Sequence, residues 1–252
     1  LTGILPIKGR VTVSAGLLDT MAPKKPASRS KFGPIDFMAT HHYYFWSPLE
    51  KTVILPMAAF GLSYGAFIGI IWPLLAMTFV YTLSYLIFFV KDTDIKLKRG
   101  EDEIKISRIT RYVFPYILGL TAVISGVNFL FAFGSLTIYY MIVTRTFDIK
   151  KLLRYVDWTI VAWVAGIIFL SNIVREHTNE ITTFLGTTGL DITTTFGFMA
   201  ISGLSFIGAF ALGSSSRFGA ITVLLASIYG IEYLPWFFAV DFAGYVLSPM
   251  HK

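Results

Sequence analysis

Residues 52–90 read TVILPMAAFGLSYGAFIGIIWPLLAMTFVYTLSYLIFFV and contain no charged side chain. A helix that crosses a bilayer needs about 20 predominantly apolar residues, so this run exceeds a single crossing. Gly61 and Gly65 divide it into a first part that contains Pro56 and a second part, residues 66–90. Only the second part is long enough to cross alone. We therefore expect a pair of membrane segments here, as two short crossings or as a crossing with a return.

The rest of the chain repeats this pattern of apolar runs between islands of charge. Charged residues make up 14% of the chain, whereas a soluble domain carries about 25%. The predicted membrane regions are residues 52–90, 112–144, 158–174 and 181–251. We expect the second region to break around Gly126 or Gly134. The composition therefore predicts an all-α, polytopic transmembrane protein in which residues 1–252 form a single membrane domain.

Basic residues are unevenly distributed, and their distribution predicts the orientation of the chain. Residues 1–51, 91–111 and 145–157 hold seven, seven and four of the 21 Lys and Arg. Cytoplasmic loops of membrane proteins are enriched in Lys and Arg. We therefore expect the loops 91–111 and 145–157 on the cytoplasmic side of the cell's inner or plasma membrane. The net charge of +6 is then a topological signal, and we expect no nucleic-acid partner.

Residues 20–51 form a polar connector that ends near an aromatic cluster, His41–Trp46. The adjacent histidines of this cluster point to different faces of a helix, and no third metal ligand is close in sequence. Trp and Tyr are enriched at membrane–water interfaces, so an interfacial belt of aromatic side chains is the favoured interpretation. The absence of Cys excludes disulfides, thiolate metal sites and cysteine nucleophiles. We expect no metal and no cofactor.

The first segment, residues 1–19, is apolar at both ends and polar in its centre. Non-helical backbone at membrane depth is tolerated only where it is buried in protein or lines a watery cavity. The pattern therefore predicts a broken or re-entrant segment beside such a cavity. Its candidate solute-binding residues are Pro6, Lys8, Gly9, Arg10 and Ser14.

A second interruption follows in the last third of the chain. Its candidate solute-binding residues are Gly213, Ser214, Ser215 and Ser216, with Ser248 and His251 near the last residue. Small residues at four-residue intervals after Gly203 allow close helix packing. In the structural interpretation, this segment serves packing alone. A serine run before Arg217 also fits a broken helix whose free N–H groups and hydroxyls face a solute.

Two carboxylates, Glu232 and Asp241, interrupt the final apolar region. A carboxylate inside a membrane is costly and is a functional candidate for that reason. Glu232 is followed by Tyr, Leu, Pro and Trp at residues 233–236, which favours an interfacial turn. Asp241 is the better candidate for a buried ionisable group. The spans contain no carboxylates paired at helical spacing, and the chain has no HExxH or Gly-x-Ser-x-Gly motif, so we expect no enzymatic activity.

Several short motifs are similar to those of a known family. Leu5–Gly9 with Ser14–Ala15 resembles a Pro-x-Pro-Gly-Gly…Ser-Ala-Pro element, and Trp46–Pro56 resembles the Trp-Pro-Leu stretch that follows it. Gly213–Ser215 and Ser248–His251 resemble a second Gly-Ser element and a Ser-Pro-x-His motif. The family that the chain resembles consists of uncharacterised prokaryotic integral membrane proteins of the ion transporter superfamily. Its relatives are gluconate, citrate, dicarboxylate and arsenite permeases and sodium/proton antiporters.

The resemblance implies a partial inverted-repeat transporter fold. Members of the superfamily are typically longer, so the chain resembles a truncated or divergent member that starts inside the hairpin of one repeat and ends inside that of the other. Lys8 and Arg10 stand where the family has Pro and Gly. If these two side chains face the cavity, they favour an anionic solute. In the alternative, they extend to the membrane interface and do not contact a solute.

The expected function is therefore that of a secondary transporter or permease for a small solute or ion. Its site would be formed by the two broken segments, residues 1–19 and the serine run after Gly213. The alternative is a non-transporting structural membrane subunit of a larger assembly, derived from a transporter. The expected partners are the lipid bilayer and a small solute or ion, with further copies of the chain or partner membrane subunits left open.

Overall fold

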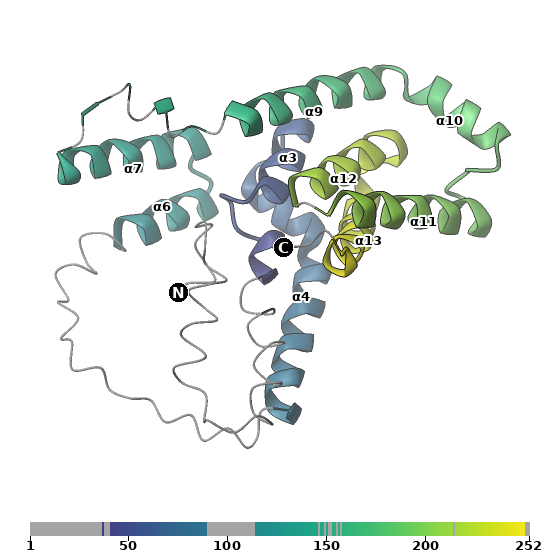
Figure 1. Ribbon diagram of the computed structural model, residues 1–252, viewed down its shortest axis with the longest axis horizontal. Coiled ribbons are helices and arrows are strands. Elements are labelled where there is room, and N and C mark those ends of the chain that lie inside the picture. The colour runs from purple at the N-terminus through teal and green to yellow at the C-terminus, as the bar shows by residue number, and fades with distance from the viewer. Residues whose placement is uncertain are drawn as a thin grey trace.

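A computed structural model describes residues 37, 41–89, 114–145, 147–148, 150, 153–154, 156, 158–213 and 215–249. This part of the chain is helical and contains no strand (Figure 1), which confirms the all-α prediction for it. The elements are η1 (His42–Phe45), α3 (Lys51–Phe60), α4 (Tyr64–Phe89), α6 (Phe114–Ile124), α7 (Phe129–Thr144), α9 (Trp158–Glu176), α10 (Thr178–Thr187), α11 (Thr195–Leu212), α12 (Ser215–Tyr229), η2 (Ile231–Tyr233) and α13 (Leu234–Leu247). The predicted segment 1–19 and the loop 91–111 lie outside the described residues.

Two of the described helices are long and apolar enough to cross a membrane, judged by length and composition. They cover Tyr64–Tyr85 in α4 and Thr195–Leu212 in α11. Only 11% of the first stretch and 22% of the second is buried within the chain. The core helix of a soluble domain would instead be mostly buried, so most of the apolar surface of these two helices faces outward.

The uncharged runs break at glycines, as the sequence predicts. Gly61 takes a left-handed conformation with φ 64° and ends α3, and α4 begins three residues later. The run 112–144 divides in the same way around Gly126, with φ 92°, between α6 and α7. These two helices pack side by side (Figure 1). A left-handed residue is cheap only for glycine, because it has no Cβ to clash with the backbone.

The core lies where α11, α12 and α13 meet (Figure 1). At the crossing of α11 and α13, a Cβ added to Gly244 would lie 2.5 Å from the backbone oxygen of Phe206. Small residues allow helix backbones to approach this closely. Elsewhere on α13, Phe237 and Phe238 are completely buried. The three helices therefore enclose the most tightly packed part of the described chain.

The aromatic cluster before α3 lies in this core and is not an exposed belt. Tyr43, Tyr44 and Phe45 are only 2%, 5% and 2% exposed. The ring of Phe45 packs against Phe238 on α13, with centroids 5.3 Å apart. Burying an aromatic ring removes a large apolar area from solvent, and α13 offers a complementary aromatic face. The prediction of an interfacial belt is therefore wrong for these three side chains.

Candidate functional site

The predicted solute-binding residues are only partly within the described chain. Gly213 and Ser248 are described, and the backbones of Ser215 and Ser216 are described as the first turn of α12. Pro6, Lys8, Gly9, Arg10, Ser14, Ser214 and His251 lie outside the described residues. The proposed meeting of the two broken segments is therefore not tested by the structure.

The chain does break at the second predicted segment. Gly213 is left-handed, with φ 53°, and its N–H donates to the Ala209 carbonyl at 3.0 Å to end α11. The next helix, α12, begins at Ser215. The predicted break between two helices is therefore present, with glycine supplying the left-handed residue that such a helix end favours.

Asp241 is the predicted residue that the structure places in the most distinctive environment. It lies in the middle of α13 and is 0% exposed. One carboxylate oxygen, Oδ1, accepts a hydrogen bond from the Ser205 hydroxyl of α11. The other, Oδ2, accepts a hydrogen bond from the Thr222 hydroxyl of α12 at 2.6 Å. The prediction that Asp241 is buried is confirmed, and its two oxygens join three helices.

The close approach of α11 and α13 explains how Ser205 reaches Asp241. Ser205 is adjacent in sequence to Phe206, whose carbonyl faces Gly244. Gly244 lies three residues after Asp241 and is on the same side of α13, because residues three apart on a helix are neighbours. Ala209, one turn after Ser205, is also completely buried at this crossing. The small residues that permit close packing therefore bring a hydroxyl to the carboxylate.

The surroundings of Asp241 are apolar, and both of its partners are neutral. Leu234, Phe237 and Val223 are each 0% exposed in the same group of helices. An ionised carboxylate in such surroundings carries a large desolvation cost unless a cation accompanies it. The two hydroxyls reduce that cost by hydrogen bonding, but neither supplies a positive charge. The site therefore favours either a neutral acid or a carboxylate with a bound cation.

A polar stripe continues from Asp241 along α13. Tyr245 and Ser248 follow at the fourth and seventh positions, so the three residues lie on one side of the helix. Tyr245 is 6% exposed and Ser248 is 5% exposed. The Tyr245 hydroxyl lies 3.0 Å from that of Tyr44. Ser248, predicted as a solute-binding residue, therefore shares its side of α13 with the buried carboxylate.

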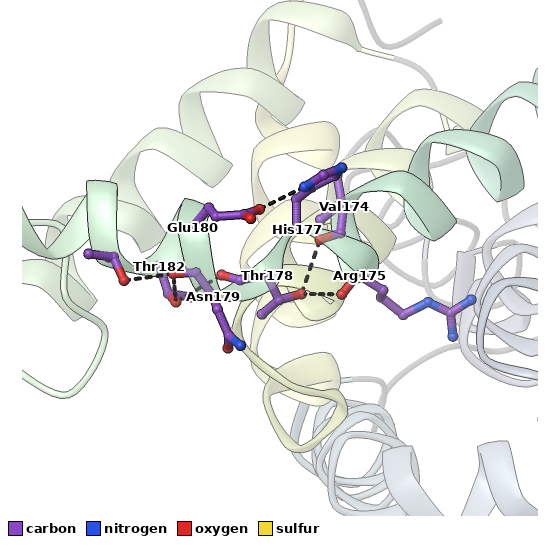
Figure 2. Close-up of polar contacts among 8 residues, drawn as sticks. Val174, Arg175, His177, Thr178, Asn179, Glu180 and Thr182 are labelled. Atoms are coloured by element: carbon purple, nitrogen blue, oxygen red, sulfur yellow. Dashed lines mark hydrogen bonds and ion pairs between the residues drawn. The ribbon is translucent and has the colours of Figure 1, made fainter.

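A separate group of polar contacts lies at the junction of α9 and α10, drawn in Figure 2. His177 Nδ1 lies 2.6 Å from the Glu180 carboxylate, and the two side chains are 58% and 74% exposed. The Thr178 hydroxyl donates to the carbonyls of Val174 and Arg175 at 3.0 and 3.1 Å. These bonds satisfy carbonyls that the end of a helix leaves without partners. The group therefore stabilises the junction and does not enclose a binding site.

Sequence reasoning identified Asp241 but missed Ser205 and Thr222. The available signal was a hydroxyl residue inside an apolar helix near a predicted buried carboxylate. Ser202, a neighbouring hydroxyl in α11, fits that signal equally well. It instead accepts a hydrogen bond from the Trp236 ring nitrogen at 2.8 Å. Only the helix crossing decides which hydroxyl meets the carboxylate.

Comparison of the chain with family models, curated proteins and solved structures gave no match. The resemblance to the ion transporter superfamily stays a prediction that rests on short motifs.

Proposed function

We propose that the protein is a secondary transporter that moves a small solute or ion across a membrane, with Asp241 as the ionisable group of its transport cycle. The observation that carries the proposal is the burial of this carboxylate between α11, α12 and α13 with two hydroxyl partners. A buried carboxylate among apolar helices lowers stability unless it is neutralised. Ionisable groups in such positions are typical of ion and proton pathways.

A multi-pass location in the inner or plasma membrane is supported by the exposed apolar surface. Soluble proteins rarely expose contiguous apolar patches larger than a few hundred Å². Here several helices expose large apolar side chains by more than half of their area; examples are Phe79, Phe131, Phe169, Phe196 and Ile207. In this proposal the shorter apolar helices cross in pairs at the glycine breaks, and the loops 91–111 and 145–157 are cytoplasmic.

The proposed solute path runs close to the break between α11 and α12. Ser205 lies on the helix before Gly213 and Thr222 on the helix after it. A movement at this break would change the distance of both hydroxyls from Asp241, which couples the carboxylate to the broken segment. Lys8 and Arg10, which lie outside the described residues, would favour an anionic solute if they face the cavity.

A second candidate is a structural membrane subunit that transports nothing. One observation favours it: each oxygen of Asp241 already accepts a hydroxyl hydrogen bond. The carboxylate then serves as a clamp between three helices and needs no ligand. Hydrogen bonds of this kind between membrane helices contribute about 0.6 kcal/mol on average.

The two candidates are separated by solute uptake into vesicles of phosphatidylethanolamine and phosphatidylglycerol that contain the purified chain. Labelled gluconate, citrate and succinate are the probes, under imposed sodium and proton gradients. We expect gradient-driven uptake by the wild type and its loss in Asp241→Asn. The matched control is Glu232→Gln, the same chemical change at an exposed side chain, which should leave uptake unchanged. Equal uptake by Asp241→Asn and wild type would refute the assigned role, and inactive, correctly folded wild type would favour the structural subunit.

A further inference from the structure

We propose that Asp241, Ser205 and Thr222 bind a monovalent metal cation of the size of Na⁺ between α11, α12 and α13. The inference deepens the proposed function, on which its role in transport rests, because it names the ion that would be coupled to solute movement. The binding itself is a separate property of these three side chains and is measured without any flux.

The oxygen atoms at Asp241 are of the kind that binds a hard cation. Both carboxylate oxygens of Asp241 lie within hydrogen-bond distance of a hydroxyl oxygen, one from Ser205 and one from Thr222. Asp241 thus brings together four oxygens from three different helices, in two hydrogen-bonded pairs. Hard cations prefer carboxylate, hydroxyl and carbonyl oxygens. A proton needs only one acceptor, whereas a metal ion needs several oxygen ligands, and these four oxygens are the candidate ligands.

The charge of the site favours a monovalent ion. Asp241 contributes one negative charge, and its two partners are neutral hydroxyls. One monovalent cation balances that charge, whereas a divalent cation would leave an uncompensated positive charge in apolar surroundings. The described residues also contain no group of three or more His, Cys, Asp or Glu side chains, the set that a transition metal requires. The ion that fits is therefore monovalent.

The two hydroxyls at Asp241 have an alternative hydrogen-bond acceptor. A Ser or Thr hydroxyl in a helix can donate to the carbonyl four residues earlier. On α11 Ser202 does so toward Phe198 at 2.7 Å, and on α12 Ser227 does so toward Val223 at 2.8 Å. The same rotation at Ser205 and Thr222 would turn their oxygen lone pairs toward the carboxylate. Cation binding therefore requires only that the two hydroxyls rotate. Each hydroxyl hydrogen then has the carbonyl four residues earlier as its acceptor.

The site is enclosed by the surrounding helices. Asp241, Ser205 and Thr222 are 0%, 3% and 1% exposed. A cation bound there has lost its water, so its size and its preference for oxygen ligands decide the affinity. Beyond the site, Tyr245 and Ser248 continue the polar side of α13 and supply further oxygen atoms along the helix. The site should therefore discriminate Na⁺ from larger cations.

The test is equilibrium binding of ²²Na⁺ to the purified chain in detergent, with K⁺ and choline as competitors. We expect saturable binding by the wild type that K⁺ and choline displace poorly. Thr222→Val keeps the shape of the side chain and removes the oxygen, and we expect it to weaken binding on the order of tenfold, as for a lost bond to a charged group. Asp241→Asn should abolish binding. The matched control is Ser227→Ala, a buried hydroxyl on the same helix that pairs with Ser171 at 2.6 Å, and it should bind as the wild type does.

The outcomes separate the site from the proposed function. Saturable Na⁺ binding that is weakened by Thr222→Val and kept by Ser227→Ala supports the site, even where no solute is transported. Solute uptake driven by protons alone, with no saturable Na⁺ binding, overturns the site and leaves the transport function standing. Should Asp241→Asn fail to fold, Thr222→Val and Ser205→Ala carry the test. Wild-type affinity in both of these variants overturns the proposal.

Discussion

Gly244→Ala is the change that tests most directly how the packing of α11 and α13 builds the site. The new Cβ would lie 2.5 Å from the Phe206 carbonyl oxygen and 3.1 Å from the Ala209 Cβ. The first neighbour is backbone, so the helices themselves must separate. Overpacking of this kind costs about 1–3 kcal/mol, and the better helix propensity of Ala returns up to about 1 kcal/mol. Because the contact is with backbone, the cost lies in the upper part of that range, and we expect a net loss of about 1–2 kcal/mol.

The separation has a second consequence at Asp241. Ser205 is the residue before Phe206, so moving α11 away lengthens the hydrogen bond between the Ser205 hydroxyl and the carboxylate. We expect weaker ²²Na⁺ binding together with a lower unfolding temperature. Both are measured on the purified chain, the second by circular dichroism during heating in detergent. The matched control is Gly203→Ala, because a Cβ at Gly203 meets nothing within 4 Å. Gly244→Ala that is as stable as Gly203→Ala would refute the packing argument.

Two further predictions concern stability. Tyr245→Phe removes the hydrogen bond between the Tyr245 and Tyr44 hydroxyls, which lie 3.0 Å apart, and should lower the free energy of unfolding by about 1 kcal/mol. The measurement is thermal unfolding of Tyr245→Phe in the wild-type background and in the Tyr44→Phe background. Equal effects in the two backgrounds would show that the two hydroxyls do not interact. Hydrogen bonds from the Thr193 side chain and backbone hold the pKa of Asp191 below its usual value. A pKa lowered by folding stabilises the fold above the unfolded-state pKa, and this stabilisation disappears as the pH falls through the folded-state pKa. Thr193→Val keeps only the backbone donor, so its unfolding temperature should depend less on pH in the acid range, and an unchanged acid profile would contradict this.

Glycine breaks were predictable because they depend on local backbone geometry. The sequence predicted a division near Gly61 and another near Gly126 or Gly134. The structure has left-handed residues at the first two and a continuous α7 through the third. In α7 the neighbouring Ser135 hydroxyl donates to the Phe131 carbonyl at 2.7 Å, which is compatible with an unbroken helix. A glycine permits a break, but the surrounding helix decides whether the break occurs.

The aromatic cluster before α3 could not be placed from its sequence. Tyr and Phe side chains suit a membrane interface and a buried core equally well, since both offer apolar contact and room for a hydroxyl. Tyr44 lies in the core because Tyr245 of α13 presents a matching hydroxyl 3.0 Å away. The two residues are separated by most of the chain, so no local pattern contains that contact.

The sequence alone determined the helical class, the apolar segments and Asp241 as the carboxylate most suited to burial. These properties follow from composition and from the cost of placing charge among apolar residues, which are visible residue by residue. The tertiary structure alone decided that Ser205 and Thr222 are the partners of Asp241. The choice depends on how closely α11 and α13 cross at Gly244 and on the rotation of each helix about its axis. Such quantities arise only when all three helices pack together.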